Sequence, residues 1–275
     1  ELRIKRHIKP VLKVFSFSVV TSIYLQLNTV LLGFLKNALA VGYFAAATKV
    51  MQMLLQMSAC LGSVMMPRAS HLIAEDKESE FNALIQKSYD FTLAIALPMT
   101  VGLICCAPNL ITSLCGVKFE NSILPSQIIA PIILMVAISN VFGIQVLFPK
   151  GKINIVTLCC GIGAVVDLVL NLCLIPFFSY VGTSIAYLGA EVATTISMFF
   201  IGRKYLPITY FKKNHLNYLL GCILMAIVLY AIADLQFSTI SILILQGCSG
   251  IVVYFLVLCV RKDIFLMQVL SKIKK

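Results

Sequence analysis

Eight long stretches of apolar residues, separated by short polar segments, set the strongest limit on how this chain can fold. A helix needs roughly 20 apolar residues to cross the hydrocarbon core of a bilayer. The stretches run about 11–34, 43–66, 90–113, 127–148, 155–177, 183–202, 216–234 and 240–260. Because 60% of the 275 residues are hydrophobic and only 12% are charged, the chain has too few charges to cover a water-exposed surface. We therefore predict an all-α fold, a polytopic transmembrane helix bundle of about eight spans.

The positions of the basic residues predict the orientation of this bundle. Of the 22 Lys and Arg residues, 19 fall in segments on one side of the predicted spans. Lys36 and Lys118 fall on the other side, and Lys49 lies inside the second stretch. Since basic loops stay in the cytoplasm, we expect both ends of this segment there. The same distribution accounts for the net charge of +11, so membrane lipids are expected partners and nucleic acid is not.

The sequence has no motif for covalent catalysis or ATP hydrolysis. The patterns G-x-x-x-x-G-K-[ST], H-E-x-x-H and G-x-S-x-G are absent. His7, His71 and His215 all fall in predicted cytoplasmic flanks, and the ten cysteines show no metal-ligand spacing. We predict a protein that is not an enzyme and that uses no metal or other cofactor.

One longer polar segment, about Pro67 to Tyr89, separates the second and third stretches. Its apolar residues Leu72, Phe81 and Leu84 recur at near-helical spacing. We expect an exposed loop here, with a short amphipathic helix lying on the cytoplasmic surface of the membrane.

Three prolines fall within or at the end of predicted spans. Pro98 lies in the third stretch, Pro131 in the fourth, and Pro176 at the end of the fifth. Each is expected to kink or to end its helix, and a rigid kink is a more common outcome than a gate.

A few polar residues lie inside the predicted spans, where a polar or charged side chain carries a free-energy cost. Asp167 is near the middle of the fifth stretch, one turn from Asn171, and Glu191 is about a third of the way along the sixth. A charge at the centre of a membrane helix costs about 2.5–3.5 kcal/mol on insertion scales, so it usually faces a partner or an aqueous cavity. One hypothesis assigns Asp167, Asn171 and Glu191 to ion coupling. The alternative is that Asp167 only holds helices together.

Two polar stripes follow the first two predicted helices. Lys49, Gln52 and Gln56 fall within one narrow arc of the second helix, and Gln26 lies in a similar stripe on the first with Asn28 close by. Two stripes on adjacent helices indicate a water-filled cavity. Lys49 would contact an anion there, and the amide side chains would hydrogen-bond a polar substrate. Alternatively, Lys49 simply extends to the membrane surface.

Several short motifs, in order along residues 10 to 205, resemble those of Wzx-type polysaccharide flippases. The motifs are Leu27-Asn28-Thr29-Val30-Leu31-Leu32-Gly33-Phe34, Ala40-Val41-Gly42-Tyr43-Phe44-Ala45-Ala46-Ala47-Thr48-Lys49-Val50, Met66-Pro67-Arg68-Ala69-Ser70, Ala96-Leu97-Pro98-Met99-Thr100-Val101-Gly102-Leu103, Gln145-Val146-Leu147-Phe148-Pro149-Lys150-Gly151-Lys152, Leu170-Asn171-Leu172-Cys173-Leu174-Ile175-Pro176 and Gly182-Thr183-Ser184-Ile185-Ala186.

This resemblance implies a member of the multidrug/oligosaccharidyl-lipid/polysaccharide exporter superfamily. Residues 1–205 would form a MATE-like C-terminal lobe of six helices, and 206–275 two extra helices with a basic cytoplasmic tail. An N-terminal lobe would precede this segment in a longer protein. The resemblance implies alternating-access flipping of undecaprenyl-pyrophosphate-linked oligosaccharides across the bacterial inner membrane, driven by an ion gradient or the membrane potential. Polysaccharide polymerase or ligase machinery would be a further partner.

Two positions depart from the family pattern. Asn28 stands where many similar sequences have an acidic residue, and Asp167 stands where many have Asn. Other functions remain open: a cation-coupled drug antiporter of the same superfamily, a lipid II flippase, and a membrane-embedded enzyme of polysaccharide synthesis. A lipid II flippase would be expected to have several arginines in its cavity, and the arginines here fall in cytoplasmic flanks.

Overall fold

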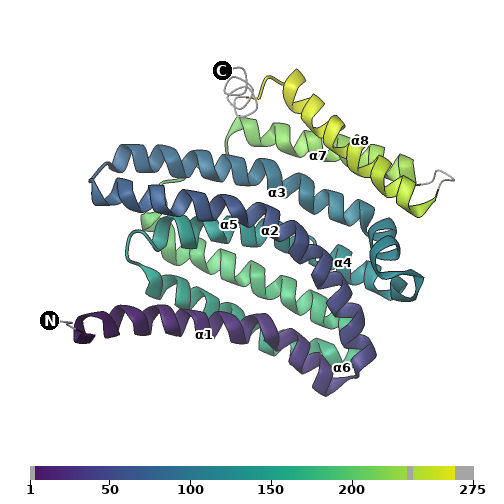
Figure 1. The fold of residues 1–275 in the computed structure, drawn as a ribbon, viewed down its shortest axis with the longest axis horizontal. Coiled ribbons are helices and arrows are strands. Elements are labelled where there is room, and N and C mark those ends of the chain that lie inside the picture. Colours follow the sequence, from purple (N-terminus) through teal and green to yellow (C-terminus); the bar gives the residue numbers. More distant parts are fainter. Residues whose placement is uncertain (1–3, 234–237, 264–275) are drawn as a thin grey trace.

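The structure, a computed structural model, describes residues 4–233 and 238–263, and all regular elements in these ranges are helices (Figure 1). In chain order they are α1 (Ile4–Leu35), α2 (Ala38–Ala74), α3 (Glu78–Cys115), the 3₁₀ helix η1 (Val117–Ser122), α4 (Ile123–Ile129), α5 (Ile132–Asn140), the π-helix η2 (Val141–Leu147), α6 (Ile153–Gly202), the 3₁₀ helix η3 (Arg203–Tyr205), α7 (Lys213–Ala233) and α8 (Thr239–Val260). The predicted all-α class is confirmed.

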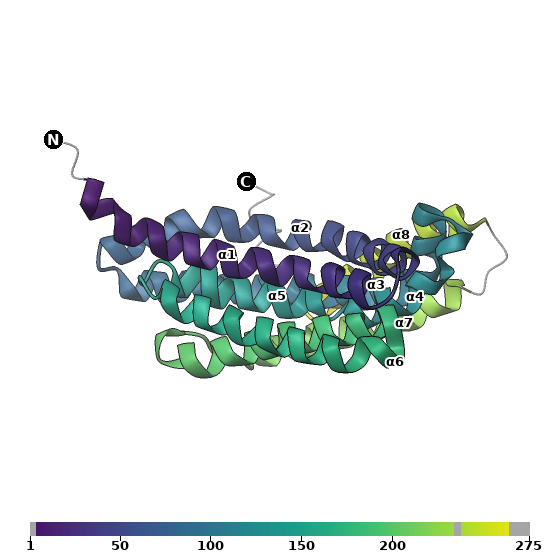
Figure 2. The ribbon, with the colours of Figure 1, turned by 90° about the horizontal axis from the view of Figure 1, so that it is seen from below.

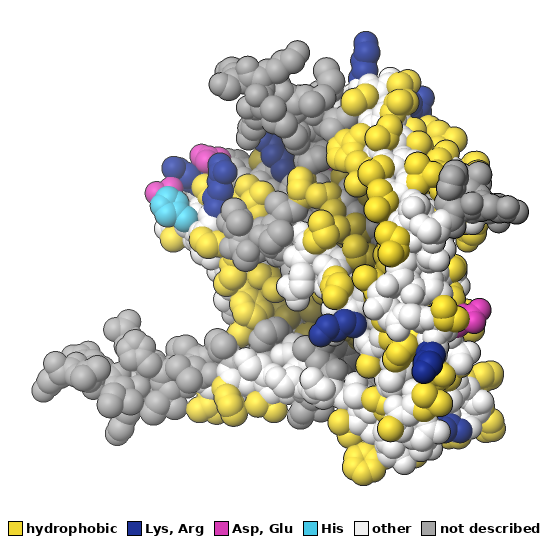
Figure 3. All heavy atoms as spheres, turned by 45° about the vertical axis from the view of Figure 1, so that its right-hand side comes forward, with side chains coloured by type: hydrophobic (Ala, Val, Ile, Leu, Met, Phe, Trp, Pro, Cys, Tyr) yellow, Lys and Arg dark blue, Asp and Glu magenta, His cyan; other side chains and the backbone are white. Residues whose placement is uncertain are grey.

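The described helices are long and apolar enough to form a membrane bundle. Five meet the length and hydropathy needed for a span, or six if the bent pair Val117–Ile129 and Ile132–Leu147 crosses as one. Two of the eight predicted stretches lie within α6. Another lies on α1, whose described apolar part is the shorter segment Gln26–Leu35. Figure 3 shows the corresponding exterior, on which hydrophobic side chains cover much of the visible face and charged ones are few.

α6 is a hairpin of two antiparallel limbs. At Ser179 the φ angle is 51°, outside the right-handed helical region, and the chain reverses there. A Cβ atom placed on Gly182 would lie 2.6 Å from the carbonyl oxygen of Leu174, so the limbs meet closely beside the reversal. At 1.5 Å per residue, the first limb (153–178) is about 39 Å long and the second limb (180–202) about 35 Å. Each is therefore long enough to cross a bilayer.

The bundle has two distinct sides and two distinct ends. In Figure 2, α1 and α2 run along the upper side and α6 and α7 along the lower side. α1 packs mainly on α6, α7 pairs with α8, and both α7 and α8 pack on α3.

The turns after α2 and η2 lie at the same end as the start of α1, on the left in Figure 1. We call this end the basic end, because most of the described Lys and Arg residues belong to it.

The prediction of an exposed loop from Pro67 to Tyr89 is wrong. α2 continues to Ala74 and α3 begins at Glu78, so only a three-residue turn joins them. Phe81 is fully buried and Leu84 is 9% exposed, because these side chains pack in the core between helices and not on a membrane surface. In the turn, the Lys77 ammonium donates to the Glu75 carboxylate at 2.9 Å, which lowers the pKa of Glu75.

The fourth predicted stretch is bent, as its proline indicated. The helices on either side of Pro131 differ in direction by 43°. Nearby, Pro108 of α3 has no N–H to bond the carbonyl of Ile104. The Gln127 side chain of α4 donates to that carbonyl oxygen at 3.1 Å. The bend thus places the side-chain amide of Gln127 next to the Ile104 carbonyl, which has no backbone donor within α3.

A second proline in α3 creates a matching bond to α8. Pro98 cannot donate to the carbonyl of Ala94, and the Tyr254 hydroxyl donates to that oxygen at 2.7 Å. Tyr254 is only 4% exposed. Because an unsatisfied backbone group in hydrocarbon costs several kcal/mol, this bond holds α8 against α3.

We predict that Tyr254→Phe lowers the free energy of unfolding by about 1–3 kcal/mol, the penalty for a buried group left unsatisfied. In a Pro98→Ala background the cost of Tyr254→Phe should be much smaller, because an alanine at that position restores the N–H that bonds the Ala94 carbonyl. Urea titration in detergent micelles measures both values. Tyr230→Phe, at a tyrosine that is 56% exposed, is the control. Equal costs of Tyr254→Phe in the two backgrounds would contradict this account.

Candidate functional site

A polar row on α2 faces away from the rest of the bundle. Lys49, Gln52 and Gln56 are all exposed, and they share this face with Met53 and Met57, which are 55% and 62% exposed. The spacing of three and four residues places all five on one side of a helix. We call Lys49, Gln52 and Gln56 the α2 polar row.

Lys49 lies deeper in its helix than the sequence suggested. α2 begins at Ala38, capped by the Asn37 side chain, which accepts a hydrogen bond from the Ala40 N–H at 2.9 Å. Lys49 is thus three turns from the helix start, about 16 Å at 1.5 Å per residue. The Lys49 side chain therefore has farther to reach to the membrane surface at that end than a lysine one turn from the helix start would have.

The stripe on α1 divides between two faces. Gln26 is exposed, as is Ser22 one turn earlier. Asn28, by contrast, is 2% exposed and faces α6. Two residues along a helix correspond to about 200° of rotation, which explains why neighbours in sequence serve different surfaces. Gln26 is thus an exposed residue of α1, and α1 lies on the same side of the bundle as α2 (Figure 2).

Asn28, Asp167 and Asn171 form a closed hydrogen-bonded group, which we call the buried polar cluster. The Asn28 Nδ2 donates to Asp167 Oδ2 at 3.0 Å, and the Asn171 Nδ2 lies 2.9 Å from Asn28 Oδ1 and 3.1 Å from Asp167 Oδ1. Asp167 and Asn171 are fully buried. Asn171 Oδ1 has no hydrogen-bond partner. The cluster joins α1 to the first limb of α6 and leaves one acceptor free beside a buried carboxyl group.

Glu191 lies on the second limb of α6, at a level close to that of Asp167. A Cβ placed on Gly163 would overlap the hydroxyl of Thr194, so residues 163 and 194 face each other across the hairpin. Because the limbs are antiparallel, position 167 then faces the region of position 190. Glu191 is 6% exposed. Both intramembrane carboxyl groups therefore belong to one hairpin, and both are buried.

A second polar group at the basic end had no signal in the sequence. The Lys212 Nζ donates to Asp90 Oδ2 at 2.8 Å, and the His215 Nε2 lies 3.1 Å from Asp90 Oδ1. The Gln86 Nε2 donates to Asp90 Oδ1 at 2.8 Å, and its Oε1 accepts from the Thr209 N–H at 2.7 Å. Lys212 and His215 are 122 and 125 residues from Asp90, and Thr209 is 123 residues from Gln86, so no local spacing reveals these contacts. Their contacts tie α3 to the segment that leads into α7.

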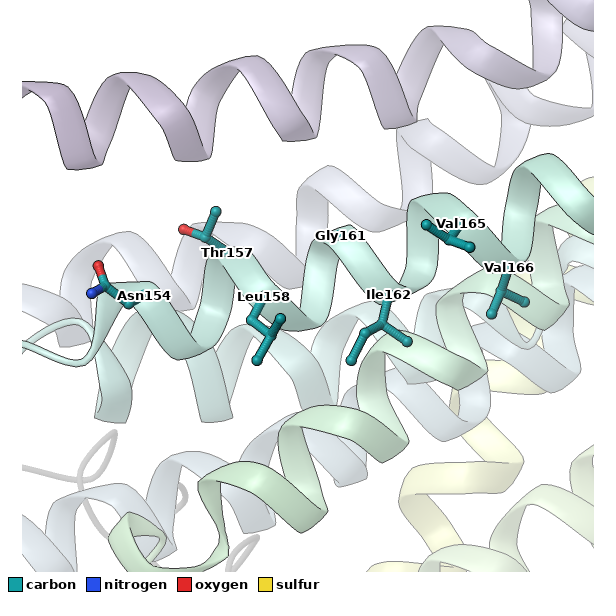
Figure 4. Close-up of a pocket in the computed structure, with 7 residues that line it drawn as sticks. All are labelled: Asn154, Thr157, Leu158, Gly161, Ile162, Val165 and Val166. Atoms are coloured by element: carbon teal, nitrogen blue, oxygen red, sulfur yellow. The ribbon is translucent and has the colours of Figure 1, made fainter.

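None of three grooves among the described residues is lined by the α2 polar row; one of them, of about 520 Å³, lies between the start of α7 and the end of α8. Another, of about 670 Å³, follows the first limb of α6 (Figure 4). It is lined by Asn154, Thr157, Leu158, Gly161, Ile162, Val165 and Val166. A third, of about 410 Å³, lies between α2, α3, α7 and α8 and has mostly apolar walls. Apart from Asn28, which is buried against α6, the residues predicted to contact substrate are exposed, so these helices alone do not enclose them.

The described residues show no arrangement typical of metal binding. No group of three or more His, Cys, Asp or Glu side chains within residues 4–233 and 238–263 could hold a metal ion. The candidate site therefore consists of an outward polar face on α1 and α2 and a buried polar cluster behind α1.

Sequence comparison identifies relatives of this chain among proteins of polysaccharide synthesis. Residues 2–124 match the family described as "Polysaccharide biosynthesis protein". A "Putative O-antigen transporter" of Escherichia coli (strain K12) is 24% identical over 202 residues, which cover 72% of this chain and 48% of the relative. A protein of the same name from Shigella dysenteriae is 28% identical over 181 residues, covering 65% and 44%. The chain spans about half the length of these relatives.

Structural comparison finds the same fold in solved transporters. The lipid II flippase MurJ in its inward closed conformation superposes with a TM-score of 0.80 at 16% identity, over 98% of this chain and 57% of that protein. An outward-facing multidrug resistance MATE family transporter of the MOP superfamily gives 0.63 at 16% identity, over 94% and 65%. This chain is thus a membrane-helix protein with the fold of MurJ and of MATE transporters, and two of its sequence relatives carry the name "Putative O-antigen transporter".

Proposed function

We propose that this chain is the C-terminal part of a transporter that flips undecaprenyl-pyrophosphate-linked oligosaccharide units across the bacterial inner membrane. The products would serve O-antigen, capsule or exopolysaccharide synthesis, and polymerase or ligase machinery would receive them. Similarity to O-antigen transporters supports the substrate class. The basic end would face the cytoplasm, with both ends of this segment on that side.

The outward position of the α2 polar row carries this proposal. A lysine facing lipid at the depth of Lys49 would cost about 2.5–3.5 kcal/mol on insertion scales. The row is therefore expected to face water and, across it, a second lobe of similar size. In that cavity Lys49 would meet the pyrophosphate. Gln26, Gln52 and Gln56 would hydrogen-bond the sugars, whose buried hydroxyls each need a partner.

The buried polar cluster is proposed to couple transport to an ion. Asn28, first considered as a sugar contact, is instead a partner of Asp167 in this arrangement. A buried carboxyl group beside the free acceptor Asn171 Oδ1 can take up a proton or a small cation. Glu191 on the facing limb would be a second group in this pathway. Binding there would change the contact between α1 and α6, and so bias one of two lobe arrangements.

A cation-coupled antiporter for drugs is the second candidate. The two buried carboxyl groups, Asp167 and Glu191, and the likeness to a MATE family transporter favour it. Such a protein would not require the cation at Lys49 for its substrate. The first experiment below therefore also separates the two functions.

We predict that Lys49→Glu in the full-length transporter reduces export of surface polysaccharide by tenfold or more, and that Lys49→Ala has a smaller effect. Loss of an ion contact worth about 1.4 kcal/mol corresponds to a tenfold change, and a glutamate adds repulsion of the pyrophosphate. Export is measured in cells that lack their own flippase, with the amount of transporter checked by immunoblot. Lys118→Ala, an exposed lysine at the opposite end of the bundle from the basic end, is the control. Normal export with Lys49→Glu would refute the anion contact and favour the antiporter.

We predict that Asp167→Asn alone abolishes most export and that exchange of the two side chains restores it. In Asp167→Asn, the new amide faces the Asn28 Nδ2, so two donors oppose each other. In the double variant Asn28→Asp/Asp167→Asn, the amide at 167 donates to the carboxylate at 28, and Asn171 keeps both of its acceptors. The cluster thus retains its hydrogen bonds and its single carboxyl group. Export rates at several values of external pH measure the effect. Normal, pH-dependent export with Asp167→Asn would show that the cluster serves packing only.

A further inference from the structure

Three lysines converge on one tyrosine at the basic end of the bundle. The Nζ atoms of Lys152 and Lys204 lie 5.3 Å and 5.0 Å from the centre of the Tyr205 ring. The Lys150 Nζ donates to the Tyr205 carbonyl oxygen at 3.2 Å and lies 5.1 Å from the centre of the Phe81 ring. Lys152 and Lys204 are exposed, and Lys150 and Tyr205 are half-buried. We call Lys150, Lys152, Lys204 and Tyr205 the lysine–tyrosine cluster.

The backbone holds two of these lysines in place. Gly151 has a φ angle of 70°, and its N–H donates to the Phe148 carbonyl at 2.9 Å. The Lys152 N–H donates to the Leu147 carbonyl at 2.8 Å. These two bonds with a left-handed glycine form the Schellman motif that ends a helix. The turn therefore fixes the backbone from which the Lys150 and Lys152 side chains extend toward Tyr205.

The cluster carries positive charge that no described carboxylate neutralises. At the same end of the bundle, Glu75 pairs with Lys77 at 2.9 Å and Asp90 pairs with Lys212 at 2.8 Å. Within residues 4–233 and 238–263, Lys150, Lys152 and Lys204 form no ion pair. Like charges gathered around one ring repel one another. A bound anion would remove that repulsion.

We propose that the lysine–tyrosine cluster binds the phosphate group of an anionic phospholipid in the leaflet at the basic end. The cluster lies where η2 ends, α6 begins and α6 ends, so it is at the level of the headgroups when the helices cross the bilayer. Tyrosine is favoured at this level because its ring is apolar and its hydroxyl is polar. Lysine binds phosphate as a point charge, and basic pockets between membrane helices bind anionic headgroups.

The chemistry of the site also matches inorganic phosphate, but the leaflet supplies lipid phosphate continuously at its own surface. Each ammonium group has three N–H donors. One face of the Tyr205 ring or one carbonyl oxygen occupies part of that capacity, and the remaining donors are free for phosphate oxygens. This site does not depend on which substrate the transporter moves, because none of its residues lies on the α2 polar row.

The absence of tryptophan from the chain permits a direct test. Tyr205→Trp provides a fluorophore with a similar flat ring, and any tryptophan outside these 275 residues is first replaced by phenylalanine so that it is the single one. The protein is reconstituted in phosphatidylcholine vesicles that contain either brominated phosphatidylglycerol or brominated phosphatidylcholine, and quenching gives the relative affinity of the lipids at position 205. We expect a preference for phosphatidylglycerol of about fivefold, the effect of roughly one lysine at a membrane surface.

The comparison uses two matched pairs of substitutions. Lys152→Gln/Lys204→Gln should reduce the preference to near unity, whereas Arg68→Gln/Lys87→Gln, which removes the same charge from exposed residues of the basic end, should leave it intact. Circular dichroism confirms that each variant is folded, and Val117→Trp, 75% exposed at the other end, provides a second reporter that should show no preference. Equal quenching by the two lipids in the Tyr205→Trp protein would overturn the proposal. Loss of the preference on adding inorganic phosphate at constant ionic strength would also overturn it, in favour of a site for the free anion.

Discussion

The need to satisfy every backbone polar group without water governs this structure. Within a bilayer, helices do so internally, but the prolines of α3 and the reversal of α6 interrupt the pattern. At each interruption a side chain from another element supplies the missing donor. Tyr254 bonds the carbonyl freed by Pro98, and Gln127 bonds the one freed by Pro108. Near the α6 reversal, the Lys36 Nζ donates to the Pro176 carbonyl at 2.9 Å. At these three irregular points, hydrogen bonds between side chains and backbone carbonyls hold neighbouring helices together.

The same constraint divides the intramembrane polar residues into two kinds. Asp167 and Asn171 are sealed from the exterior and take their hydrogen bonds from each other and from α1. Lys49 and the glutamines of the α2 polar row lie on an outer face, and these helices supply no enclosure for them. A sealed polar group can exist in an isolated lobe, because its partners are present. An exposed lysine at this depth needs an aqueous surrounding, so the row is where a complete transporter should place its cavity.

The sequence was sufficient to predict the helical spans, the bend at Pro131 and the shared face of Lys49, Gln52 and Gln56, because each depends on spacing along a single helix. It failed for the segment after Pro67. There the local charges suggested a solvated loop, whereas burial of Phe81 and its neighbours extends both helices into a tight turn. The sequence also could not show that Gln26 is exposed whereas Asn28 is buried, because this difference depends on where α6 packs against α1. The Asp90 contacts with Lys212 and His215 join residues more than a hundred positions apart, and only packing reveals them.

α1 connects the two kinds of polar site. Asn28 on its inner face bonds Asp167 at 3.0 Å, and Gln26, about 200° around the helix, faces outward beside the proposed cavity. A helix is stiff over this distance, so we expect a change in the charge of Asp167 that lengthens or breaks its bond to Asn28 to shift the outer face of α1 as well. α1 meets the first limb of α6 through this cluster and meets α2 through a short turn. We infer that an ion bound at Asp167 would reach the substrate face by displacement of α1, with no need for the ion and substrate to share one cavity.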